Sequence, residues 1–183
     1  MLSASQNQLA WRSNAATMSE HRTYLNIGSN IKPEVHLPKA LELLAKHVCI
    51  QAVSSAWESR AVGSGAPNFL NACALFASPL EPAGIKEELI QPIETALDRK
   101  RGAEKYAPRT IDLDVIMFDG NPLRLEQWNL AYIVVPMAEL DPNLEHPITH
   151  EKISEVADRI RLQTWIVPRP EILRHYSQGR SKS

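Results

Sequence analysis

The spacing of apolar residues predicts short strands alternating with amphipathic helices. Runs rich in β-branched residues predict strands over 24–27, 48–57, 69–77, 110–118 and 131–136. Apolar residues at helical spacing predict helices over 37–44 and 85–97, and a closing helix over 153–160. The first six elements follow the order β, α, β, β, α, β. This order predicts an α+β fold, a ferredoxin-like split βαβ plan with helices against one face of a mainly antiparallel sheet.

Glycine and proline positions add detail to this pattern. Gly28-Ser29-Asn30 directly follows the first strand and predicts a turn with positive φ. Pro92 falls inside the second helix, where it lacks an amide N–H and crowds the carbonyl of Glu88, so we expect a kink or a break there. The segment 118–122 contains Asp119-Gly120 and predicts a turn after the 110–118 strand.

Length and composition predict one globular domain. The chain has 183 residues, 44% of them hydrophobic, which suffices for one core. We expect a disordered extension over 1–22, a single domain over 23–172 and a frayed tail over 173–183. Cys49 and Cys73 lie in apolar runs, which favours buried free thiols in a reducing, cytoplasmic compartment. We expect no membrane span, and a monomer or weak homodimer.

Two aspartates stand two positions apart in the 110–118 strand. Side chains alternate along a strand, so Asp112 and Asp114 should share one face with 110, 116 and 118, while 111, 113, 115 and 117 occupy the other. Their Cα atoms should lie about 7 Å apart, at a rise of roughly 3.3 Å per residue. That spacing suits carboxylates that hold one hard cation or bridge two. The alternative is a pair of solvated acids on the exposed face of an edge strand.

A basic segment immediately precedes the two aspartates. Residues 99–109 carry five cationic side chains and Tyr106. Arginine forks bind phosphate oxygens, and an aromatic ring can stack on a heterocycle, so this segment suits a polyphosphate. The glycine-bearing loop at 63–65 lacks the features of a dinucleotide-binding turn, and no Gly-Lys-Ser/Thr occurs, which excludes a P-loop. The net charge of −1 gives no general field for nucleic acid, so anion binding must be local.

The segment 99–118 resembles the signature of the 6-hydroxymethyl-7,8-dihydropterin pyrophosphokinase family. The family pattern is an Arg-rich loop, then Trp-Gly-Pro-Arg and Asp-Leu-Asp, and the equivalents here are Tyr106-Ala107-Pro108-Arg109 and Asp112-Leu113-Asp114. Residues 24–30, 54–75 and 132–140 are similar to further blocks of the family. The resemblance implies transfer of the β,γ-diphosphate of ATP to a pterin hydroxymethyl group, with release of AMP. ATP would be the co-substrate and two Mg²⁺ the cofactors.

The resemblance also implies roles for individual residues. Asp112 and Asp114 would hold the metal ions, and Arg99, Arg101 and Arg109 would be the catalytic phosphate clamps. Pterin binding would fall to Asn71, Phe69, Tyr106, Tyr132 and Ser59. Nucleotide binding would involve Gln91, Glu94, Arg101 and Lys105. Asn71 also has a case of its own, because an amide in an apolar strand must be paired when buried and can match the amino-oxo edge of a pterin.

Two other functions remain open. The connection at 119–131 is shorter than in the family, and Leu130 stands where the family has an arginine. This motivates a pterin- or nucleotide-binding paralogue with weak or no kinase activity. The second alternative is a ferredoxin-like nucleic-acid-binding module, which would need a basic face and stacking aromatics. With 6% aromatic residues and a near-neutral balance, the sequence disfavours that module.

Overall fold

A computed structural model describes residues 20–61, 67–100 and 108–177. The strands are β1 (His21–Ser29), β2 (Cys49–Val53), β3 (Ala56–Ser59), β4 (Phe69–Ser78), β5 (Asp112–Phe118), β6 (Asn121–Pro122) and β7 (Ile166–Arg169). The helices are α2 (Pro33–Leu44), α3 (Pro82–Gly84), the π-helix η1 (Ile85–Ile90), α4 (Gln91–Ala96), the 3₁₀ turn η2 (Leu125–Gln127), α5 (Ala131–Leu140), α6 (Ile153–Gln163) and α7 (Arg174–Ser177).

The strands form one sheet in the order β6-β5-β1-β4-β3-β7, and β2 also pairs with β4. Every strand pair described is antiparallel. The central position of β1 between β4 and β5 is the split βαβ arrangement, so the predicted α+β fold class is confirmed. The sequence treated 48–57 as one strand, whereas the structure divides it into β2 and β3 around Ser54 and Ser55.

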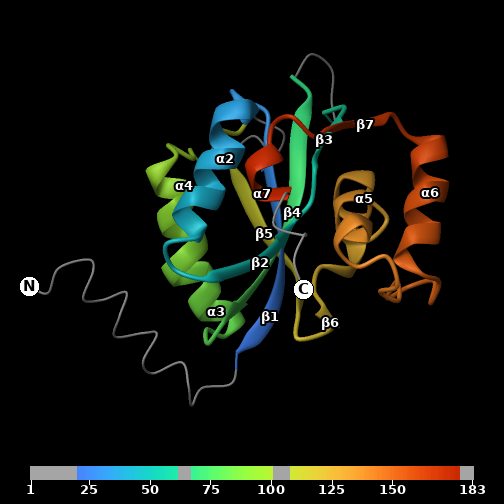
Figure 1. The fold of residues 1–183 in the computed structure, drawn as a ribbon, viewed down its shortest axis with the longest axis horizontal. Helices are drawn as coiled ribbons and strands as arrows, with labels where there is room; N and C mark the ends of the chain where they lie inside the picture. Colours follow the sequence, from blue (N-terminus) through green and yellow to red (C-terminus); the bar gives the residue numbers. More distant parts are fainter. Residues whose placement is uncertain (1–19, 62–66, 101–107, 178–183) are drawn as a thin grey trace, which may run out of the picture.

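Helices cover both faces of the sheet, which corrects the one-face prediction. Residues of α2, η1 and α4 pack on one face, where Leu25, Ile27 and Phe76 are buried. Residues of α5 and α6 pack on the opposite face, over Tyr24, Cys73 and Leu75. Figure 1 shows α2 and α4 on one side of the sheet and α5 and α6 on the other. Each face therefore has its own hydrophobic core.

The predicted strand at 131–136 is wrong, because this segment begins helix α5. Ile133, Val134 and Val135 are all buried there, and a short apolar run buried all round does not reveal its period. The helix continues to Leu140, and Glu139 on it accepts hydrogen bonds from Ser55 N at 2.6 Å and Trp57 Nε1 at 3.1 Å. These contacts with neighbouring strands hold α5 across the sheet face.

A β-bulge in β5 changes the predicted alternation. Tyr24 pairs with Met117 but Leu25 pairs with Val115, which leaves Ile116 as the extra residue. Ile116 and Met117 consequently both pack on the α5 face, while Phe118 packs on the α2 face. The predicted faces of 117 and 118 are therefore exchanged. The positions before the bulge, including both aspartates, keep the predicted alternation.

Other local predictions have mixed outcomes. The distortion expected at Pro92 takes the form of the π-helix η1, in which Gln91 N bonds to Lys86 O. The turn predicted over 118–122 is present between β5 and β6, where Asp119 and Gly120 both have positive φ.

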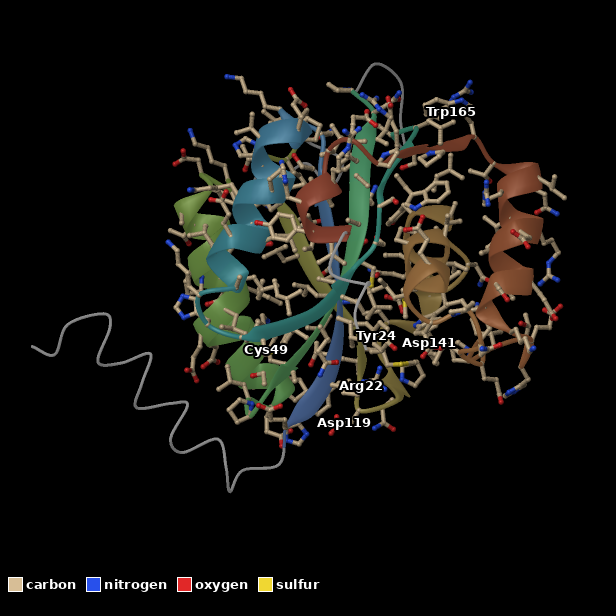
Figure 2. All side chains as sticks on the ribbon, in the orientation of Figure 1. Arg22, Tyr24, Cys49, Asp119, Asp141 and Trp165 are labelled. Carbon is tan, nitrogen blue, oxygen red and sulfur yellow. The ribbon has the colours of Figure 1, made fainter. Side chains whose placement is uncertain are left out.

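The prediction of two buried cysteines holds for one of them. Cys73 is buried, but Cys49 is exposed, because it lies at the start of β2 with its side chain away from both cores. Figure 2 shows Cys49 near one end of the sheet.

The ordered chain extends further than the predicted domain boundary at 172. Leu173 is buried in the α2-side core, and Arg174–Ser177 form the short helix α7. The predicted frayed tail is thus wrong for 173–177, since Leu173 is buried there. The predicted disordered extension over 1–22 is wrong for His21 and Arg22, which belong to β1. Residues 1–19 and 178–183 lie outside the described residues. Across the described ranges, no helix has the length and apolar character that crossing a bilayer requires.

Candidate functional site

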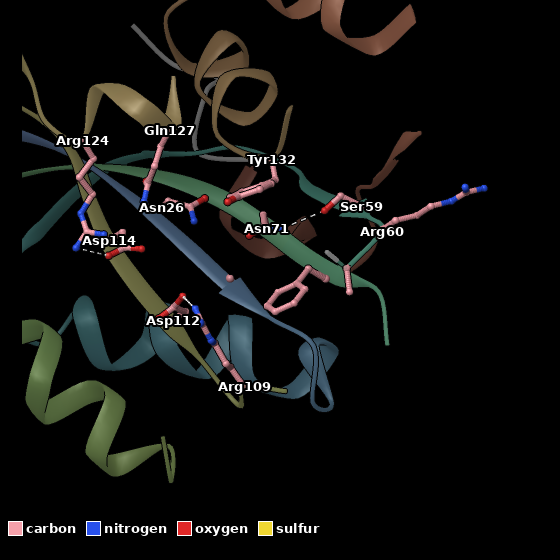
Figure 3. Close-up of a pocket in the computed structure, with 13 residues that line it drawn as sticks. Asn26, Ser59, Arg60, Asn71, Arg109, Asp112, Asp114, Arg124, Gln127 and Tyr132 are labelled. Atoms are coloured by element: carbon pink, nitrogen blue, oxygen red, sulfur yellow. Dashed lines mark hydrogen bonds and ion pairs between the residues drawn. The ribbon is translucent and has the colours of Figure 1, made fainter. Parts of the chain in front are cut away.

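A cavity of about 270 Å³ opens on the α5 face of the sheet. Its lining combines carboxylates, arginines, amides and aromatic rings. The described lining residues are Asn26, Gly28, Ser59, Arg60, Ala61, Phe69, Asn71, Arg109, Asp112, Asp114, Arg124, Gln127 and Tyr132. Figure 3 shows that they converge from the strands below and from the segment that leads into α5.

The floor of the cavity consists of two cross-strand rows. In one row, Gly28 of β1 pairs with Asp112 of β5 and with Asn71 of β4. In the other row, Asn26 of β1 pairs with Asp114 of β5. Residues directly opposite each other in neighbouring strands point to the same face of a sheet. The strand register therefore brings both aspartates and both asparagines to one surface.

Gly28 makes room for the amide of Asn71. A Cβ at position 28 would lie 2.6 Å from Asn71 Oδ1, closer than real Cβ contacts. Gly28 belongs to β1 and does not have positive φ, so the predicted turn at this residue is wrong. The glycine is required because a side chain approaches the backbone closely here.

Asp112 is held by two arginines. Arg99 donates to Asp112 Oδ1 at 3.0 Å, and Arg109 donates to Asp112 Oδ2. Because the two arginines engage different oxygens, the carboxylate and both guanidinium groups form one partly buried cluster. This arrangement places two predicted phosphate-clamping residues beside a predicted metal ligand.

Asp114 has a different environment. Burial raises its pKa above the ordinary value, the nearby Asp112 raises it further, and Arg124 lowers it. Arg124 NH2 lies 2.9 Å from Asp114 Oδ1, but the Arg124 side chain is 50% exposed. Figure 3 shows this ion pair at one end of the cavity. Of the two carboxylates, Asp114 is therefore the one whose negative charge is less compensated in this structure.

The backbone that carries Arg109 is fixed by the end of β1. Asn30 Oδ1 accepts a hydrogen bond from Arg109 N at 2.6 Å, and the amides of Asn30 and Ile31 both donate to Arg109 O. Asn30 Nδ2 also donates to Pro67 O at 3.3 Å. Asn30 is buried. One amide thus connects the residues just before β5 with Pro67, just before β4.

The predicted pterin-side residues lie together at the other end of the cavity. Asn71 is buried and donates to Ser59 Oγ at 3.5 Å, and Phe69 and Tyr132 also line the wall. Burial raises the pKa of Tyr132, and the negative charges of Asp114 and Asp112 raise it further. Tyr132 is in helix α5, so the predicted residue reaches the cavity from an element that the sequence misassigned.

Glu94 and Gln91, predicted to contact nucleotide, do not line this cavity. Glu94 is buried, and its Oε1 accepts a hydrogen bond from Leu113 N at 3.2 Å. It therefore supports β5 between the two aspartates from the opposite face of the sheet. Gln91 is exposed on α4. Arg101, Lys105 and Tyr106 lie outside the described residues.

Sequence reasoning missed four polar lining residues: Asn26, Arg60, Arg124 and Gln127. Asn26 carries the same signal as Asn71, an amide within an apolar strand, and could have been found by it. Arg124 and Gln127 belong to a connection without hydrophobic periodicity, so only the tertiary structure brings them to the site. Arg60 is at the rim, with its guanidinium 5.7 Å from the Trp165 ring centroid.

The lining fits a Mg²⁺ ion. Magnesium prefers oxygen ligands, and proteins usually bind it through one or two carboxylates, with the remaining positions taken by water and substrate phosphates. Asp112 and Asp114 supply two carboxylates on one face. Within the described ranges, no group of three or more His, Cys, Asp or Glu is arranged so that it could hold a metal ion. The chain thus offers the ligand set of a phosphate-associated metal ion rather than of a fully protein-bound one.

Comparisons with known proteins agree on one family. A family model described as 7,8-dihydro-6-hydroxymethylpterin-pyrophosphokinase (HPPK) matches residues 24–142. The chain is 31% identical over 149 residues to the 2-amino-4-hydroxy-6-hydroxymethyldihydropteridine pyrophosphokinase of Bacillus subtilis, covering 75% of this chain and 88% of that protein. The protein of the same name in Aquifex aeolicus is 29% identical over 145 residues, covering 72% of this chain and 88% of that protein.

A solved structure is similar in fold. A crystal structure of an HPPK-DHPS protein in complex with substrates superposes with a TM-score of 0.61 at 12% sequence identity. The match covers 77% of this chain and 43% of that longer chain. This similarity supports the fold assignment, while the family assignment comes from the sequence matches.

Proposed function

The chain belongs to the 7,8-dihydro-6-hydroxymethylpterin-pyrophosphokinase family, and from this we propose that it makes 6-hydroxymethyl-7,8-dihydropterin diphosphate from the pterin and ATP. One observation carries the proposal: the same cavity is lined by the carboxylates of Asp112 and Asp114, by Arg109 and by the amide of Asn71. In the reaction, the pterin hydroxyl oxygen attacks the β-phosphorus of ATP and the bond from that phosphorus to the α,β-bridging oxygen breaks. AMP leaves with that oxygen, and the hydroxyl group gives up its proton to the surrounding water.

Asp112 and Asp114 are the proposed ligands of two Mg²⁺ ions. When bound, the metal would neutralise phosphate charge and orient the diphosphate for in-line transfer. The carboxylates share a face before the β5 bulge, so the backbone, rather than a flexible loop, sets their separation. Glu94 supports this strand through Leu113 N.

Arg99 and Arg109 are the proposed clamps on the transferred diphosphate. Both lie against Asp112, so both are within reach of phosphates that a metal at Asp112 would bind. Guanidinium groups aimed at developing charge stabilise the transition state more than the ground state. Arg101, Lys105 and Gln91 stay predictions for phosphate and nucleotide contact.

Asn71, Phe69, Tyr132 and Ser59 are the proposed pterin contacts, with Tyr106 as a further prediction. The buried Asn71 amide offers a fixed donor and acceptor, and the aromatic rings of Phe69 and Tyr132 stand in the same wall. Such a wall suits a flat heterocycle with polar edges.

The proposal is tested by AMP formation from ATP in the presence and absence of 6-hydroxymethyl-7,8-dihydropterin, with the purified full chain and Mg²⁺. We expect AMP only when the pterin is present, and none above background for Asp114→Asn. Asp158→Asn, an exposed acid of α6, is the matched control and should retain wild-type turnover. Pterin-dependent AMP formation that survives in Asp114→Asn, or none in the wild type, would contradict the proposal.

A further inference from the structure

Two oxygen atoms in the cavity lining have no hydrogen-bond partner among the described residues. They are Asn26 Oδ1 and Gln127 Oε1, and both are buried atoms of residues that line the cavity. Asn26 as a whole is only 7% exposed. Most buried polar groups in proteins are paired, because an unmet acceptor costs free energy. Two such atoms from different elements, β1 and η2, in one cavity indicate a ligand that supplies donors.

The position of Asn26 restricts what that ligand can be. Asn26 stands directly opposite Asp114 in the β1–β5 register. Cβ atoms of directly opposed residues are about 4.5–5.5 Å apart, a span that one ordered water can bridge. Figure 3 shows Gln127 reaching from the segment before α5 toward Asn26, with Asp114 on the neighbouring strand. Asn71, on the proposed pterin side, lies in the next cross-strand row, with Gly28 and Asp112.

We propose that Asn26 and Gln127 accept hydrogen bonds from water molecules of a hydrated divalent cation that Asp114 holds. The inference rests on the proposed function and adds two residues to its metal site. A hydrated cation brings both positive charge and O–H donors, and Mg²⁺ in particular retains several of its waters when bound. Neutral amides supply acceptors without adding a third negative charge beside Asp112 and Asp114.

The test compares Mg²⁺ affinity with stability in the absence of ligand. Mg²⁺ is titrated calorimetrically into the full chain saturated with a non-hydrolysable ATP analogue, and thermal melts are recorded without ligand. Asn26→Leu should weaken Mg²⁺ binding about tenfold and leave the melting temperature unchanged or higher, because it removes an unpaired buried acceptor. Gln127→Leu should behave in the same way.

A charge variant and a matched control sharpen the result. Asn26→Asp should tighten Mg²⁺ binding and lower the melting temperature without Mg²⁺, because it adds a third carboxylate beside Asp112 and Asp114. Thr23→Val is the control: Thr23 is in the same strand, is fully buried and has a hydroxyl without a partner among the described residues, but it does not line the cavity. It should leave Mg²⁺ affinity unchanged.

Three results would overturn the inference. The first is wild-type Mg²⁺ affinity in Asn26→Leu. The second is a melting temperature lowered by several degrees in that variant, which would mark Asn26 as structural. The third is weaker pterin binding with unchanged Mg²⁺ affinity, which would assign the amide to the substrate. A wild-type protein that binds no Mg²⁺-nucleotide would overturn the proposed function, and this inference with it.

Discussion

The two aspartates of the site share a face but not an environment. Asp112 has two arginine partners, whereas Asp114 is partly buried beside another carboxylate and has one half-exposed arginine partner. The sequence left two alternatives for the pair: ligands of a metal ion, or solvated acids on the exposed face of an edge strand. The structure pairs Asp112 with two arginines and leaves the charge of Asp114 less compensated.

We therefore predict opposite effects of the same substitution on stability without ligand. Asp112→Asn should lower the free energy of unfolding by about 1–3 kcal/mol, because it leaves Arg99 and Arg109 without their carboxylate. Asp114→Asn should leave it unchanged or raise it by up to about 1 kcal/mol, since an exposed ion pair is worth little and the repulsion is relieved. Urea unfolding monitored by circular dichroism measures both. Equal destabilisation of the two variants would refute the distinction.

Gly28 gives a second prediction at this scale. Gly28→Ala should displace the Asn71 amide, because the new Cβ would lie 2.6 Å from Asn71 Oδ1. A mispositioned buried amide costs about 1–3 kcal/mol, so pterin affinity should fall about tenfold or more. Pterin titration by fluorescence measures the loss. Gly84→Ala, where the added Cβ meets nothing closer than 3.4 Å, is the control and should bind pterin normally.

Elements are held to one another at this site by single polar side chains. The end of β1 is fixed to the start of β5 by Asn30, and β5 is supported by Glu94 on α4. On the α5 face, Glu139 of α5 accepts hydrogen bonds from Trp57 of β3 and from Ser55, the residue just before β3. Tyr24 of β1 donates to Asp141 at the end of α5, as Figure 2 indicates by their proximity. The site thus lies where several separate elements meet.

Asn30→Ala should therefore affect catalysis as well as stability. It leaves Arg109 N and Pro67 O without their partners, which should cost about 1–3 kcal/mol of unfolding free energy. Because Arg109 is then less well positioned, turnover should fall further than pterin affinity. Steady-state kinetics and urea unfolding check this. Lost stability together with wild-type turnover would show that Asn30 has no positioning role.

At the scale of the whole molecule, both faces of the sheet are covered by a hydrophobic core. The start of β1 meets the turn that follows β5 at one end of the sheet. There His21 of β1 contacts Asp119 of the β5–β6 turn and lies near Glu81 before α3. The hydrogen bond to Asp119 raises the pKa of His21, and the same contact lowers the pKa of Asp119. We therefore expect the stability of the fold to depend on pH through the contact between His21 and Asp119.

A group with a raised folded-state pKa stabilises the fold fully below its unfolded pKa, near 6.5 for histidine, and loses that contribution as pH rises through the folded value. Thermal stability of the wild type should consequently decline above about pH 6.5 relative to Asp119→Asn. The asparagine can still accept from Arg22 N and tolerates the positive φ of this position. Melting temperatures from pH 5.5 to 8.5 provide the measurement, and parallel curves would exclude the coupling.

The sequence by itself determined the order of the first six elements, the shared face of Asp112 and Asp114, and the family to which the chain belongs. These depend on local periodicity and on a contiguous motif, which the sequence displays directly. The family resemblance pointed to Asn71, Phe69, Tyr132 and Ser59, all of which line the cavity. Local periodicity failed at 131–136, because an apolar run buried on every side has no visible period.

Only the tertiary structure decided which side chains meet. The pairing of Asn26 with Asp114, and of Gly28 with Asn71, depends on strand register, which is set by hydrophobic burial over the whole sheet rather than by either residue. Arg124 and Gln127 come from a connection whose path is fixed by its ends, β5 and α5. Contacts between residues far apart in sequence follow from how both cores pack, and no local pattern encodes them.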